Sequence, residues 1–168
     1  MTLELFNHID PFTAREELHR CCGATRWVDW MLAQRPFADE AQLYLRAAEI
    51  WAQCTREDYL EAFGRHPKIG DISSLEKKFA STKEWSAGEQ AGVNTASGET
   101  IKALAKGNKA YEEKFGYIFI VCATGKSAAE MLALLQARLP NNLETEFRIA
   151  AAEQAKITRI RLEKMLSK

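Results

Sequence analysis

The chain has 168 residues, a length typical of one domain and sufficient to bury a core without disulfides or a structural metal. Hydrophobic residues make up 46% and charged residues 27%, as in ordinary soluble globular proteins. Lysine plus arginine equals aspartate plus glutamate at 23 each, so no basic surplus attracts nucleic acid or anionic lipid. We therefore expect one domain over residues 1–168 that binds neither nucleic acid nor a membrane.

The cysteines and the ends of the chain indicate a cytoplasmic protein. The N-terminus lacks a signal-peptide pattern, and the longest apolar run, residues 117–123, is too short to span a bilayer. The cysteines form no CxxC or Cys/His pattern, which predicts free thiols in a reducing compartment and no metal site. They are Cys21, Cys22, Cys54 and Cys122.

Two helices are predicted before residue 34. Asp10 followed by Pro11 predicts the first, with an N-cap and a proline at the first helical position, and Gly23 predicts its end. Residues 25–33 predict the second, because apolar residues recur there at three-to-four spacing. That apolar stripe consists of Trp27, Trp30 and Met31.

Two further helices precede an irregular stretch. Asp39 caps a helix that reaches about residue 54, and Thr55 caps a short helix that ends at Gly64. Residues 65–98 are polar and irregular but carry isolated large apolar residues, with one short helix near residues 74–80. This composition is typical of a folded loop that lines a site.

The rest of the chain predicts three more helices, over residues 97–116, 127–139 and 142–166. Between the first two, residues 117–123 are rich in β-branched and aromatic side chains and by propensity resemble a buried strand. A lone strand cannot satisfy its own backbone, so we expect a buried helix start or an extended segment. The predicted fold class is all-α, a single compact bundle of about eight helices with an irregular active-site segment.

His66 is the first candidate for chemistry. It follows a predicted helix end, and Pro67 holds it outside helical geometry. Histidine titrates near neutral pH, which suits a general acid or base. A loop histidine is more often a surface or structural residue, so the pattern alone does not establish a catalytic role.

Glu89 and Arg161 each allow two interpretations. Ser86 and Glu89 form a capping-box pattern, in which Glu89 bonds back to the helix start or turns towards His66 and orients the imidazole. Arg161 continues an apolar stripe on the last helix, so its guanidinium either extends to solvent or enters a pocket, where it would suit an anionic substrate. The stripe consists of Phe147, Ala150, Gln154, Ile157 and Arg161.

The order and spacing of short motifs over nearly the whole chain resemble the 2-oxo-4-hydroxy-4-carboxy-5-ureidoimidazoline (OHCU) decarboxylase family of uric acid degradation. Those motifs are Arg20-Cys21-Cys22, Gln34-Arg35-Pro36-Phe37, His66-Pro67-Lys68-Ile69-Gly70, Trp85-Ser86, Glu89-Gln90-Ala91-Gly92, Asn108 with Tyr111, Lys114-Phe115-Gly116-Tyr117, residues 119–123, Arg138-Leu139, Glu153 with Lys156-Ile157, and Arg161-Leu162.

The resemblance implies a carboxy-lyase that forms (S)-allantoin in purine catabolism, with a small ureide as substrate, no cofactor and a possible homodimer. It implies His66 as the catalytic acid, Glu89 as its partner and Arg161 as a substrate contact. The implied substrate-binding residues are Pro67, Ser86, Ala87, Gly88, Glu89, Gln90, Phe119, Ile120, Val121, Cys122 and Ala123. In the last of these segments, unpaired backbone groups would bond the ureide.

The chemistry of such a substrate explains the absence of a cofactor motif. Its carboxylate is attached to a carbon next to a C=N bond, so the electrons released with CO2 flow into the substrate itself. Two alternatives stay open: a helical protein-interaction domain that docks through Trp27 and Trp30, and a relative that acts on another ureide acid.

Overall fold

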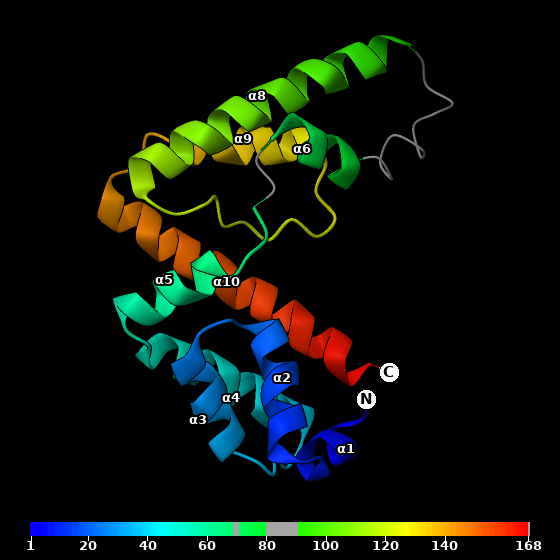
Figure 1. Ribbon diagram of the computed structural model, residues 1–168, viewed down its shortest axis with the longest axis vertical. Helices are drawn as coiled ribbons and strands as arrows, with labels where there is room; N and C mark the ends of the chain where they lie inside the picture. Colours follow the sequence, from blue (N-terminus) through cyan, green and yellow to red (C-terminus); the bar gives the residue numbers. More distant parts are fainter. Residues whose placement is uncertain (69–70, 80–90, 168) are drawn as a thin grey trace. The chain divides into compact units, whose positions relative to one another are not determined.

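The computed structural model describes residues 1–68, 71–79 and 91–167, with no side-chain description for residues 91–97. Within these ranges every regular element is a helix, which confirms the predicted all-α class (Figure 1). The helices are α1 (Leu3–His8), α2 (Pro11–Cys21), α3 (Thr25–Ala33), α4 (Glu40–Gln53), α5 (Arg56–Gly64), α6 (Ile72–Lys78), α8 (Ala91–Phe115), α9 (Ala128–Arg138) and α10 (Leu143–Leu166).

Side-chain caps account for most helix starts. Asp10 accepts a hydrogen bond from the Thr13 backbone N–H at the start of α2, and Asp39 does the same for Gln42 at the start of α4. Capping boxes at Thr55 and Ser127 start α5 and α9. These contacts satisfy backbone N–H groups that have no partner within the helix. They form between neighbours in sequence, so the predicted boundaries lie close to the observed ones.

Two helices differ from the prediction. The six-residue α1 was not predicted, since it is too short to show a helical period. Helix α8 begins at Ala91 rather than near Ser97. Gly92, Asn94 and Thr95 are weak helix formers, so the sequence signal starts after them although the helix does not.

The chain divides into two compact units, and the single-domain expectation stays a prediction. The first unit contains residues 1–66, 120–122 and 150–168. Its largest fully buried side chain is Trp27, whose indole N–H donates to the Ala47 carbonyl oxygen at 3.0 Å. The Trp51 indole donates in the same way to Ala151 on α10 at 2.9 Å, which joins α4 to the last helix.

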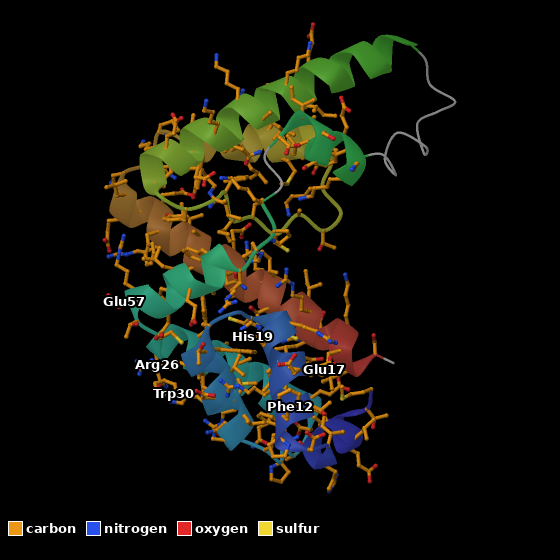
Figure 2. The ribbon with its side chains drawn as sticks, in the orientation of Figure 1. Phe12, Glu17, His19, Arg26, Trp30 and Glu57 are labelled. Carbon is orange, nitrogen blue, oxygen red and sulfur yellow. The ribbon has the colours of Figure 1, made fainter. Side chains whose placement is uncertain are left out.

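The stripe predicted on α3 is only partly buried. Trp27 and Met31 are fully buried, whereas Trp30 is 36% exposed and lies under the guanidinium of Arg26 at 5.4 Å. Figure 2 shows Arg26 and Trp30 on the outer side of α3. Trp27 therefore cannot contribute to the docking face of the interaction-domain alternative, because its indole belongs to the core.

The second unit contains residues 67–119 and 123–149. Glu146 is its buried polar centre, with no exposed surface. One of its carboxylate oxygens accepts from the Tyr111 hydroxyl at 2.5 Å and from Arg138 Nε at 2.7 Å, and the other accepts from Asn141 at 3.1 Å. These partners satisfy a charge that would be very unfavourable if it were left alone in the core.

Residues 118–123 adopt no regular structure, which settles the open prediction in favour of a non-helical segment. Ile120 and Cys122 are buried, and the intervening Val121 is half-buried. None of the helices in the described ranges combines the length and the apolar character that crossing a bilayer requires.

The buried Arg138–Glu146 pair predicts a large effect of neutralising one partner. Glu146→Gln should lower the free energy of unfolding by about 3 kcal/mol, because it removes the charged partner of a buried ion pair. The control is Glu144→Gln, which removes an exposed ion pair with Arg148 and should cost less than about 1 kcal/mol. Urea unfolding measures both, and equal effects would contradict the assignment.

Candidate active site

His66 lies two residues past the end of α5. Its backbone N–H donates to the Phe63 carbonyl oxygen at 3.3 Å, which continues the helix end by a tight turn. Phe63 is fully buried and anchors this turn in the core of the first unit. The local sequence thus fixes the backbone of His66, while its half-buried side chain extends from the helix end.

The imidazole lines a cavity of about 320 Å³ within the first unit. The cavity brings His66 and Arg161, which are far apart in the sequence, to one place. Its other lining residues come from the end of α2, the loop after it and the end of α5. They are His19, Arg20, Gly23, Ala62 and Arg65. Figure 2 shows His19 near the C-terminal end of α2.

The cavity is strongly basic, although the whole chain is neutral. Arg20, Arg65 and Arg161 all line it. The only ion pair that the described residues give these three is between Arg20 and Glu17, at 2.9 Å, and Arg161 donates to the Arg20 carbonyl oxygen at 3.4 Å. Guanidinium groups match carboxylates in shape and charge, so the cavity suits an anionic ligand.

Gly23 allows the wall of this cavity to close. A Cβ atom at this position would lie 2.5 Å from Cγ and 2.6 Å from Cβ of Arg65, closer than real side chains approach. Residue 23 must therefore be a glycine for the Arg65 stem to pack there. The sequence indicated Gly23 only as a helix end.

The surroundings of His66 favour its neutral form. Burial lowers the pKa of the imidazole below its ordinary value of 6.5, and the positive charge of Arg161 lowers it further. A contact with Gln154 acts in the opposite direction and raises the pKa. A neutral imidazole in a basic cavity can accept a proton from a bound ligand.

Gln154 is the polar contact that sequence reasoning missed. Its Oε1 atom contacts Nε2 of His66, and its side-chain N–H donates to the Thr158 hydroxyl at 3.1 Å. In the sequence, Gln154 stands out only as a member of the apolar stripe on α10. A glutamine in line with buried positions is the signal that identifies it, because a buried amide requires partners.

In the apolar run of residues 119–123, one backbone group that was expected to bind the ureide has a partner within the protein. The Cys122 backbone N–H, expected to be free for a ureide, donates to a Glu153 carboxylate oxygen at 3.2 Å. Ile120–Cys122 belong to the first unit, whereas Phe119 and Ala123 belong to the second. Within that second unit the Arg138 guanidinium lies 4.5 Å over the Phe119 ring.

Several predicted site residues cannot be placed at this cavity. Pro67 is exposed and belongs to the second unit. The others lie outside the described residues and stay predictions: Ser86, Ala87, Gly88, Glu89 and Gln90.

Comparison with known proteins shows what the chain resembles. The sequence model described as OHCU decarboxylase matches residues 7–163. A relative from Arabidopsis thaliana, "Uric acid degradation bifunctional protein TTL", is 36% identical over 153 residues, which cover 90% of this chain and 47% of the relative. The OHCU decarboxylase of Haloferax volcanii is 24% identical, with coverage of 99% and 97%.

A solved structure agrees with these sequence matches. The crystal structure of an OHCU decarboxylase in the presence of (S)-allantoin superimposes with a TM-score of 0.73 at 34% identity, covering 91% of this chain and 99% of that one. The bifunctional relatives are longer proteins: this chain spans 47% of the Arabidopsis protein and 33% of its counterpart from Bacillus subtilis.

The lowered pKa of His66 predicts acid-sensitive stability. Below about pH 6.5 the unfolded chain binds a proton at this histidine. The folded chain does so only at lower pH, so the free energy of unfolding should fall through this window. His66→Asn should remove this part of the pH dependence in urea unfolding between pH 5 and 7.5. His8→Asn, at an exposed histidine of α1, is the matched control. Identical slopes for wild type and His66→Asn would count against a depressed pKa.

Proposed function

The chain belongs to the OHCU decarboxylase family, and on that premise we propose that it converts 2-oxo-4-hydroxy-4-carboxy-5-ureidoimidazoline into (S)-allantoin during uric acid degradation. The observation that carries the proposal is the cavity where His66 and Arg161 meet among further arginines. A cavity of about 320 Å³ is the size of a small-molecule site. Its charge suits a substrate that carries a carboxylate.

In the proposed reaction the protein moves a proton and the substrate supplies the electron sink. Breaking the bond to CO2 leaves an electron pair that enters the adjacent C=N bond, and the resulting enol later gains a proton on one face. His66 exchanges a proton with the hydroxyl or imine side of the substrate. Its depressed pKa supports this role, because the imidazole is neutral and ready to accept a proton at neutral pH.

Arg161 and the predicted segments complete the proposed site. Arg161 orients the anionic and ureido groups rather than gripping the leaving carboxylate, because a firm grip would stabilise the substrate before CO2 leaves. Glu89 is the proposed carboxylate partner of His66. Residues 86–90 and 119–123 are the proposed contacts for the ureide. A cytoplasmic location, independence of cofactors and a homodimer remain parts of the proposal.

The decisive experiment follows optical rotation. Uric acid, urate oxidase and the hydrolase that acts on its product generate the substrate in the cuvette, where it decays spontaneously to racemic allantoin. Adding the protein should produce dextrorotatory allantoin faster than this background. No acceleration would favour the interaction-domain alternative, and acceleration only with a related ureide acid would favour the other one.

His66→Asn should lower kcat by about 10²-fold or more, because general acid–base catalysis contributes about that factor. Ligand binding should remain measurable by calorimetry with allantoin, since the cavity keeps its arginines. Wild-type turnover in this variant would show that His66 is not the proton-transfer group.

Arg161→Lys should raise KM by roughly tenfold with a smaller change in kcat, because a lysine keeps the charge but loses the forked geometry. Arg148→Lys, on an exposed part of the same helix, is the control and should leave both constants unchanged. An unchanged KM in Arg161→Lys would remove Arg161 from the proposed site.

A further inference from the structure

We propose that Gln154 is a positioning residue that keeps the proton of the neutral His66 imidazole on Nε2, which leaves Nδ1 as the nitrogen that exchanges a proton in the cavity. The catalytic meaning of this inference rests on the proposed function. The tautomer itself is a property of the free protein and can be tested without substrate.

The burial of Gln154 is the first step of the argument. This side chain is only 1% exposed, so its amide has no access to solvent and must find partners inside the protein. It has two, His66 through Oε1 and Thr158 through Nε2. An amide oxygen only accepts hydrogen bonds, so the imidazole nitrogen that faces it must carry a proton.

Thr158 holds the end of the Gln154 amide that points away from the histidine. It lies one turn after Gln154 on α10, is 5% exposed and accepts the amide proton at 3.1 Å. The Thr158 hydroxyl also acts on the Cys22 side chain, whose thiol pKa it lowers. The donors therefore run from His66 to Gln154 and from Gln154 to Thr158.

Cys22, beside Thr158, adds no charge to this arrangement. Burial raises the pKa of its thiol to about 12, so the sulfur does not ionise near neutral pH. The sulfur also accepts the backbone N–H of Ala24. No group in the relay from Gln154 to Cys22 changes charge near neutral pH, and the relay therefore holds the imidazole without competing for its proton.

The other charged groups around the imidazole favour the same neutral state. Arg161 lines the cavity from α10 and Arg20 lines it from the end of α2. Arg65, which precedes His66 in the sequence, lines it as well. Among the residues that the structure describes, these arginines and His19 are the titratable groups that line the cavity with His66. A single-proton imidazole with Nε2–H presents an unprotonated Nδ1, which is the basic nitrogen. In the proposed reaction Glu89 would stabilise the imidazolium that forms after Nδ1 takes up its proton.

The test is a pH titration of the whole protein, labelled with 15N at histidine, by NMR. Above its pKa, wild-type His66 should show a protonated Nε2 and an unprotonated Nδ1. In Gln154→Leu the two tautomers should mix, and the pKa should fall further because the contact that raises it is lost. Gln154→Glu should raise the pKa by roughly one unit or more, since a carboxylate favours the imidazolium.

Kinetics then connect the tautomer to turnover. The acid limb of the pH profile of kcat should move to lower pH in Gln154→Leu and to higher pH in Gln154→Glu, by the amounts that the titrations give. Gln154→Leu should lower kcat by roughly ten- to a hundredfold, the scale of a misplaced catalytic group, with less than about a twofold change in KM. A role confined to stability would leave the pH profile in place.

Matched variants separate the relay from general damage. Thr158→Val frees the amide to rotate and should admit the other tautomer, whereas Thr158→Ser keeps the hydroxyl and should behave as wild type. Gln53→Leu at the end of α4 makes the same chemical change on an exposed surface and should alter nothing. If Gln154→Leu does not fold, the tautomer is measured in Thr158→Val and the pKa shift in Gln154→Glu.

The failures of the two proposals can be told apart. A proton on Nδ1 in the wild type, or a tautomer and pKa unchanged in Gln154→Leu, would overturn the inference whatever the activity. A shifted tautomer together with full turnover in His66→Asn would leave the positioning by Gln154 intact and remove His66 from the catalytic step.

Discussion

The contact between the His66 imidazole and the Gln154 amide joins the end of α5 to α10, and the candidate site depends on it. The Gln154 amide is buried and the imidazole is half-buried, so the amide needs the imidazole as a hydrogen-bond partner. Arg161 lies two helical turns after Gln154 and lines the same cavity. Helix α10 therefore provides both Gln154, which contacts the imidazole, and Arg161, which places a positive charge beside it.

The two compact units use buried polar groups in different ways. In the second unit, Glu146 has hydrogen-bond partners on both carboxylate oxygens, and its charge is balanced by Arg138. Such a centre supports a unique packing. In the first unit, the cavity gathers several cations around a half-buried imidazole, with Glu17 as the acidic partner that the described residues provide. That imbalance is unfavourable for folding but suits a site for an anion.

The neutral imidazole and the basic cavity are linked by the same electrostatics. Positive charges that attract a carboxylate also make protonation of a nearby histidine less favourable. These charges and the burial of the imidazole keep it mainly neutral at neutral pH, which is the form that the proposed proton transfer requires. A neutral amide as its partner preserves this balance, whereas a carboxylate at the same position would favour the charged form.

The sequence by itself determined the helical architecture, because caps and apolar periodicity act between residues within a few positions of each other. Asp10, Asp39, Thr55 and Ser127 start helices through such local contacts. The resemblance between motifs also singled out His66 and Arg161 before any geometry was known. Each of these signals can be read from neighbouring residues or from motif order.

Only the tertiary structure decided which distant residues share a cavity. The amide partner of His66 is 88 positions away, and no periodicity in the sequence connects the two. In the sequence, Gly23 indicates only the end of a helix. In the structure, the Arg65 side chain occupies the space that a Cβ atom at residue 23 would need. Trp27 and Trp30 are the same residue type on one short helix, yet they differ in exposure. Packing against α4 buries Trp27 and leaves Trp30 partly exposed. Contacts of this kind depend on how helices pack, which a linear pattern does not encode.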